Sequence, residues 1–142
     1  MSSRAVPTSD EIAHARAELA ARDHLMARAH AAVAPFVWRE RPGGFVGLAT
    51  MVVEQQVSVA AAAAIWKKLE TGLGGAVTPH AVLSSDEAAL RGFGLSGQKA
   101  RYVRAIAQAG GLFDDLHAMD DAQAVAHLTA IKGVGRWTAE VY

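Results

Sequence analysis

The stretch Ile131-Lys-Gly-Val-Gly-Arg-Trp-Thr-Ala-Glu140 places two glycines one residue apart between two segments of helical character. Glycine reaches positive φ at no steric cost, so Gly133 and Gly135 are consistent with a helix end followed by a tight turn. The same geometry also lets a ligand approach the backbone, where the unpaired amides of the next helix point outward. Because Lys132 and Arg136 add positive charge beside the turn, the residues leave two interpretations open: a plain turn and a phosphate-binding turn.

The composition around this stretch is that of a globular protein. With 142 residues the chain has the size of a single domain, and we expect one domain over residues 1–142. A net charge of zero excludes a surface coated in positive charge but leaves room for a small basic patch. The absence of cysteine excludes disulfides and thiolate metal sites within the sequence. No apolar run approaches the ~20 residues that span a bilayer, and no signal segment opens the chain. We therefore expect a cytoplasmic protein without a membrane partner.

Helical periodicity runs through the sequence, and no segment shows convincing strand alternation. Residues 8–33 form either one helix or two helices broken near Asp23, and residues 35–44 are predicted to be a loop. Residues 45–53 are apolar nearly all round, which predicts a central buried helix. Helix starts with cap-like residues are predicted at Thr8 or Ser9, Ser58, Thr78, Ser85-Asp86, Ser96 and Asp120. The fold class is therefore all-α, a compact multi-helix domain.

Common metal and nucleotide motifs are absent. No two of the six histidines are four residues apart, so the sequence contains no zinc-binding helix of the His-Glu-x-x-His type. The glycines at 72–75 follow a helix rather than a strand and lack the Gly-Lys-Ser/Thr ending of a nucleotide-binding loop. The sequence therefore predicts no cofactor for chemistry.

Three segments carry a resemblance to a known family. Ile131–Glu140 resembles the helix-hairpin-helix of DNA base-excision glycosylases, and its Arg-Trp-Thr-Ala run is similar to that of the 3-methyladenine DNA glycosylase II family. Phe45–Val59 resembles the buried helix of that family, which ends in Gln-Gln-x-Ser. Gly94-Leu-Ser-Gly-Gln-Lys-Ala100 resembles its Gly-Leu-Ser-x-x-Lys-Ala stretch. The segments occur in the order of the family, which implies a helix-hairpin-helix near the C-terminal end of the chain.

The resemblance assigns roles within the hairpin. It implies that amides around Gly133, Gly135 and Thr138 bind a DNA phosphate, with Lys132 and Arg136 beside them. It also implies a monovalent cation that stiffens the hairpin, held by the backbone carbonyls of Thr129, Ile131 and Val134.

Further implied roles concern the flipped nucleotide. Gln56 is expected to be the wedge that fills the gap left by an extruded nucleotide, with Gln55 as its support. An ordinary polar helix end is the alternative for this pair. Trp137 is expected to wall the base pocket by stacking on an electron-poor alkylated base, and a buried core tryptophan is its alternative.

The position of Trp137 also indicates the chemistry. Related bifunctional glycosylase/lyases carry there the lysine that forms a Schiff base, so tryptophan favours a monofunctional mechanism. The resemblance thus implies a DNA N-glycosylase that removes alkylated bases, such as 3-methyladenine, from double-stranded DNA by base flipping and hydrolysis. A non-catalytic helix-hairpin-helix module that only binds DNA is the alternative. The oligomeric state is left open.

The catalytic aspartate of the family follows the helix that begins near Arg136, and no aspartate of this sequence takes that position. The four aspartates nearest to the hairpin all precede it, and we interpret them as loop and N-cap residues: Asp114, Asp115, Asp120 and Asp121. We therefore expect the sequence to stop before the catalytic aspartate and residues 1–142 alone to be inactive.

Overall fold

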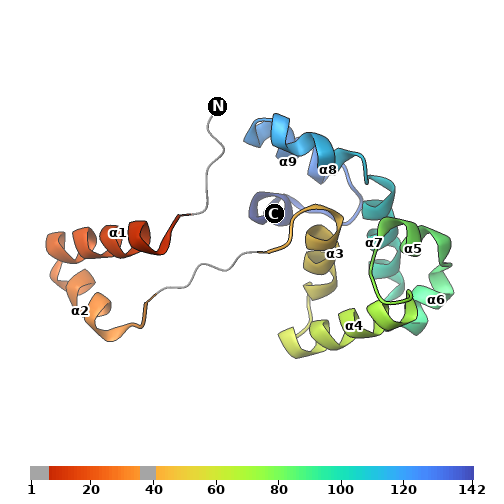
Figure 1. The fold of residues 1–142 in the computed structure, drawn as a ribbon, viewed down its shortest axis with the longest axis horizontal. Helices are drawn as coiled ribbons and strands as arrows, with labels where there is room; N and C mark the ends of the chain where they lie inside the picture. The colour runs from red at the N-terminus through yellow and green to blue at the C-terminus, as the bar shows by residue number, and fades with distance from the viewer. Residues whose placement is uncertain (1–6, 36–40) are drawn as a thin grey trace. The chain divides into compact units, whose positions relative to one another are not determined.

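The computed structural model describes residues 7–35 and 41–142, and within these ranges it contains helices and turns but no strand (Figure 1). The predicted all-α class is confirmed. In chain order the elements are α1 Ser9–Arg22, α2 His24–Ala32, α3 Gly44–Glu54, α4 Val59–Gly72, α5 Pro79–Ser84, α6 Glu87–Gly92, α7 Gly97–Gln108, α8 Leu112–Asp115, the 3-10 turn η1 Leu116–Ala118, α9 Asp121–Thr129 and α10 Arg136–Val141. Among the described residues, no helix has the length and apolar character needed to cross a membrane.

Contacts along the chain form two compact units, Met1–Arg41 and Pro42–Tyr142. The sequence led us to expect one domain over residues 1–142, so the structure divides the chain more finely than that expectation. The boundary falls in the predicted loop at 35–44, of which residues 36–40 lie outside the described residues. Every residue to which the sequence assigned a role belongs to the second unit.

The first unit is a pair of helices that meet at Asp23, which settles the open choice in favour of two helices. Asp23 has an extended backbone, ends α1, and accepts hydrogen bonds from amides in the first turn of α2. The Arg16 guanidinium ties the two helices together by donating to the carbonyls of Val33 and Ala34, at 3.3 and 3.2 Å. Neither helix has a buried residue, and Leu19 is 52% exposed.

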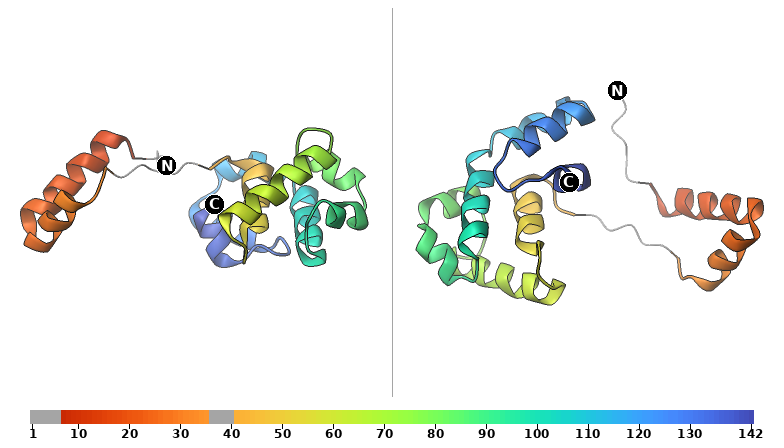
Figure 2. Two further views of the ribbon diagram at one scale, coloured as in Figure 1. Left: turned by 90° about the horizontal axis from the view of Figure 1, so that it is seen from below. Right: turned by 180° about the vertical axis from the view of Figure 1, so that it is seen from behind.

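The second unit is built around α3, the buried helix that residues 45–53 predicted. Its residues Leu48, Ala49 and Val52 have no exposed surface, as expected for a helix that is apolar nearly all round. Figure 1 and the right-hand view of Figure 2 show α3 and α7 side by side, with α4 across one end of both. Helices α5 and α6 pack on α7, and α10 packs on α9.

Side chains cap most helices of this unit, as the sequence predicted. The cap residues of α4, α5, α6, α7 and α9 each accept a hydrogen bond from an amide of the first turn, and they are Ser58, Thr78, Asp86, Ser96 and Asp120. The cap role of Asp120 confirms its interpretation as a helix-start residue. Helices α3, α8 and α10 differ, because each begins after a glycine that has no capping side chain. For α3 the amide of Gly44 donates instead to the Tyr142 hydroxyl at 2.6 Å.

One helix is shorter than its apolar stripe indicated. Tyr102, Ile106, Ala109 and Phe113 have the spacing of one helical face, whereas α7 ends at Gln108 and Phe113 belongs to α8. The break falls next to the two glycines at 110–111. A glycine within a helix is unfavourable, because it loses more backbone freedom than other residues and has no side chain to pack. Phe113 still packs against the common core, as the spacing of the four apolar residues indicates.

Candidate nucleic-acid interface

The hairpin between α9 and α10 is a tight turn that needs its first glycine. The amides of Ile131 and Val134 donate to the carbonyls of Leu128 and Ile131 at 3.1 and 3.0 Å, so the chain reverses within a few residues. Gly133 has φ +94°, which side chains with a Cβ rarely adopt. A Cβ at Gly133 would also overlap the ring of Tyr102 on α7. Local structure therefore accounts for Gly133 completely.

The second glycine is not required by the fold in the same way. Gly135 has φ −84°, and no atom lies within 4 Å of the position that a Cβ would occupy. It is the N-cap of α10, and no side chain caps the first amides of that helix. Open space in front of uncapped amides suits an anion from outside the chain. Of the two interpretations left open by the sequence, the phosphate-binding turn thus has support at Gly135.

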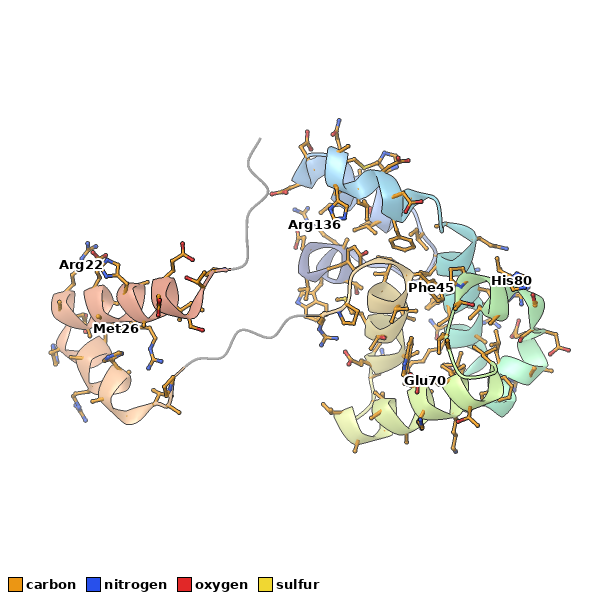
Figure 3. The ribbon with its side chains drawn as sticks, viewed as in Figure 1. Arg22, Met26, Phe45, Glu70, His80 and Arg136 are labelled. Atoms are coloured by element: carbon orange, nitrogen blue, oxygen red, sulfur yellow. The ribbon has the colours of Figure 1, made fainter. Side chains whose placement is uncertain are left out.

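The charges beside the turn are less free than the sequence indicated. Lys132 is exposed, but the Arg136 Nε donates to Glu140 Oε1 at 2.7 Å on the same helix. Arg136 is labelled in Figure 3. The hydrogen bond to Glu140, together with the charge attraction, raises the pKa of the Arg136 guanidinium. Thr138 is only 5% exposed, so little of its surface is open to a ligand.

The carbonyl groups proposed for a cation have suitable chemistry. Backbone carbonyls are hard oxygen ligands of the kind that bind alkali cations. Among the backbone hydrogen bonds of the described residues, the carbonyl of Ile131 accepts from Val134, whereas none is accepted by the carbonyls of Thr129 or Val134. Within the described ranges no cluster of acidic, histidine or cysteine side chains could hold a metal ion.

Trp137 is exposed. The structure leaves 71% of its surface open to solvent, so the alternative of a buried core tryptophan is wrong. The inward face of α10 is formed instead by Thr138 and Ala139, both 5% exposed. A large exposed indole in the first turn after the hairpin is unusual for a soluble protein and suits a stacking surface.

Gln55 and Gln56 form the turn between α3 and α4. Gln55 ends α3, and the Val57 amide donates to the Glu54 carbonyl at 3.4 Å across the turn. Gln56 has φ +57°, and no other described residue besides glycine has a positive φ. Its side chain is exposed. Helices often end with a left-handed residue at this position, but it is usually glycine, and a residue with a Cβ is strained there. Because such strain clusters at functional sites, it favours the wedge interpretation of Gln56 over an ordinary polar helix end.

One side chain that contacts this turn was not among the predicted site residues. Lys99 on α7 donates from its Nζ to the carbonyls of Val53 and Gln55, both at 2.7 Å. Burial lowers the pKa of the Lys99 ammonium, because water no longer solvates its charge fully. The sequence did carry a signal for it, since Lys99 is the lysine of the segment Gly94–Ala100.

A cavity of about 470 Å³ does not coincide with these residues. It lies among α8, α9 and α10, and its lining includes Phe113, Leu128 and Tyr142 but neither Gln56 nor Trp137. We therefore assign the interface from the hairpin and the glutamine turn and not from this cavity.

Comparisons with known proteins identify the family of this chain. Residues 49–137 match the family model of the HhH-GPD superfamily base excision DNA repair protein, which is more than half of the chain. DNA-3-methyladenine glycosylase 1 of Schizosaccharomyces pombe is 29% identical over 109 residues, covering 72% of this chain and 48% of that protein. The chain thus spans about half the length of this curated relative.

Solved structures give the same result. A DNA-3-methyladenine glycosidase from Bacillus halodurans superposes with a TM-score of 0.71 at 30% identity, covering 89% of this chain and 61% of that one. A 3-methyladenine DNA glycosylase from Schizosaccharomyces pombe, solved in complex with abasic DNA, has a TM-score of 0.73 at 26% identity, covering 89% and 66% of the two chains. The family match includes the glutamine turn and the hairpin up to Trp137. The chain therefore belongs to the HhH-GPD superfamily of base excision DNA repair proteins.

Proposed function

We propose that this protein is a monofunctional DNA N-glycosylase that removes alkylated bases, such as 3-methyladenine, from double-stranded DNA. The observation that carries the proposal is the combination, in one compact unit, of a hairpin with open space at Gly135 and a left-handed, exposed Gln56. Relatives that bear the name DNA-3-methyladenine glycosylase support the substrate class. An enzyme that acts on a base must extrude it from the stack, which requires both a grip on the backbone and a filler for the gap.

The hairpin supplies the grip in this proposal. Amides around Gly133, Gly135 and Thr138 bind one phosphate, and the space in front of Gly135 lets the phosphate approach the first turn of α10. Lys132 and Arg136 add charge attraction that does not depend on base sequence. The carbonyls of Thr129, Ile131 and Val134 hold a monovalent cation, whose charge stiffens the turn and favours the nearby phosphate.

The glutamine turn supplies the filler. Gln56 projects from a turn whose direction is fixed on both sides, by the buried α3 before it and by the Ser58-capped α4 after it. Its amide group can take up hydrogen bonds of the orphaned opposite base. Gln55 supports the turn through its carbonyl, which accepts from Lys99.

The exposed Trp137 receives the flipped base. An alkylated purine carries positive charge, which the face of an indole attracts. Such a base also leaves as a neutral group, so its departure needs little acid assistance. The oxocarbenium-like sugar requires a carboxylate for stabilisation, and we assign this role to none of the described residues.

Base release tests the activity and its monofunctional character. At its full natural length, the protein should release 3-methyladenine from methylated duplex DNA, measured by chromatography of the free base. Borohydride added during the reaction should trap no covalent complex, because Trp137 cannot form a Schiff base. Trp137→Ala should slow release about tenfold or more through lost stacking, and Trp137→Phe should slow it less. A trapped complex, or equal rates in both variants, would contradict the proposed mechanism.

The two glycines of the hairpin should respond differently to substitution. Gly135→Val should weaken binding to all duplex sequences alike, by about tenfold, because the side chain blocks an amide–phosphate contact without touching the fold. Gly133→Val should lower stability as well, because of its positive φ and its contact with Tyr102. Fluorescence anisotropy and urea unfolding measure the two effects.

Gly111 provides the control for this experiment, since it is also an exposed N-cap with open space around it. Gly111→Val should leave DNA affinity unchanged. If Gly135→Val binds as tightly as the control, the phosphate site is not at this turn.

Side-chain removal at Gln56 tests the wedge. Gln56→Gly should lower the preference for duplex with an abasic-site analogue over undamaged duplex by about tenfold. The same change should raise stability, because glycine relieves the left-handed backbone. Gln55→Ala should have a smaller effect on the preference, and Gln108→Ala, at an exposed glutamine that ends α7, should have none. Equal affinity losses on both duplexes would identify Gln56 as a simple surface residue.

Breaking the Arg136–Glu140 pair should strengthen DNA binding, whereas the preceding substitutions should weaken it. Glu140→Gln should raise DNA affinity by about twofold to fivefold at low salt, because it frees Arg136 and removes a negative charge near the phosphate. Glu18→Gln, which breaks a comparable pair with Arg22 in the other compact unit, changes the net charge equally and serves as the control. Equal gains in both variants would mean that only net charge matters.

A further inference from the structure

Lys99 contacts the glutamine turn from a distant part of the sequence. It lies in the first turn of α7 and donates to the carbonyls of Val53, in the last turn of α3, and of Gln55, the C-cap of that helix. Carbonyls at a helix C-terminus have no partner within the helix. A cation at a helix C-terminus is also favoured by the helix dipole. The two hydrogen bonds of Lys99 thus hold the backbone just before Gln56 at two points, Val53 and Gln55.

This contact is partly buried, since Lys99 and Gln55 are neither fully exposed nor part of the core. Burial lowers the pKa of the Lys99 ammonium, so placing the charge there carries a cost that the two carbonyl bonds offset. Loss of the ammonium would leave both carbonyls without a donor.

The next turn of the same helix contacts the hairpin. The ring of Tyr102 lies against Gly133, and its hydroxyl accepts a hydrogen bond from Gln98 Nε2 at 2.6 Å. Residues three apart on a helix lie on the same side. One face of α7 therefore touches both the hairpin, through Tyr102, and the glutamine turn, through Lys99.

We propose that Lys99 is a positioning residue, which holds Gln56 in its left-handed orientation and sets its place relative to the hairpin. The proposal rests on the wedge role of Gln56 in the proposed function. A left-handed residue with a Cβ persists only where its surroundings determine it, and the Lys99 bonds to the carbonyls of Val53 and Gln55 provide that restraint. Without them the turn is free to relax, and the glutamine points elsewhere part of the time.

Arg104 on the same helix is a matched control. Its Nη1 donates to the carbonyls of Val82 and Ser85, at the end of α5, in the same way that Lys99 serves α3. No residue of α5 has a role in the proposed interface. Lys99→Met and Arg104→Met therefore each remove one cation from two helix-end carbonyls, but only the first change adjoins Gln56.

The first measurement is the affinity ratio between duplex with an abasic-site analogue and undamaged duplex. Lys99→Met should reduce this ratio about fivefold to tenfold, and Arg104→Met should leave it within about twofold of wild type. Lys99→Arg, which keeps a donor but changes its geometry, should give an intermediate ratio and carries the test if Lys99→Met does not fold. Equal ratios for Lys99→Met, Lys99→Arg and wild type would overturn the proposal.

A double-mutant cycle shows whether Lys99 acts through the glutamine. In a Gln56→Gly background, Lys99→Met should cause no further fall in the ratio, since there is no side chain left to position. An undiminished fall in that background would overturn the proposal, because Lys99 would then contact DNA or act on another element.

Hydrogen exchange in the free protein separates the restraint from the DNA-binding function. The amides of Gln55 and Val57, which donate to Val52 and Glu54, should exchange at least several-fold faster in Lys99→Met than in Arg104→Met. Unchanged exchange overturns the restraint itself. Faster exchange in a protein whose wild type shows no abasic preference would instead refute the wedge function and, with it, the positioning role.

Discussion

The buried helix α3 is the constraint on which the rest of the second unit depends. A helix that is apolar nearly all round is stabilised by burial on most sides. Helix α7 therefore lies beside it and α4 and α8 also pack on it, while Val46 stays exposed. Its two ends still have to reach polar partners. At the N-terminus the Gly44 amide donates to the Tyr142 hydroxyl, and at the C-terminus two carbonyls accept hydrogen bonds from Lys99. Burial of one helix thereby places the glutamine turn at a defined point of the surface.

Helix α7 connects this core to both parts of the candidate interface. Its apolar residues Val103 and Ile106 are fully buried, while its polar side chains reach the ends of neighbouring helices. A rigid helix transmits position well, because its side chains are held at fixed spacing along one axis. The hairpin and the glutamine turn lie far apart in sequence, yet they contact side chains one turn apart on α7, Tyr102 and Lys99.

The proposed DNA interface is compatible with a net charge of zero on the chain. Attraction to the DNA backbone depends on charges within about one Debye length, ~8 Å at physiological ionic strength, and not on the total. Near the hairpin, Arg136 is balanced by Glu140, which leaves Lys132 as the more available charge. Backbone amides carry no net charge, so a grip that relies on them is compatible with a neutral protein.

The sequence by itself determined the helical fold, the helix starts and the family resemblance, because periodicity, cap residues and short motifs are local properties. It correctly predicted the buried residues 45–53 and the caps at Ser58 and Ser96. It could not show which of the two hairpin glycines the fold requires, since the difference lies in the ring of Tyr102 against Gly133 and the open space at Gly135. The exposure of Trp137 and the reach of Lys99 to Gln55 were likewise decided only by the tertiary structure. Such contacts join residues dozens of positions apart, and their partners are set by how whole helices pack.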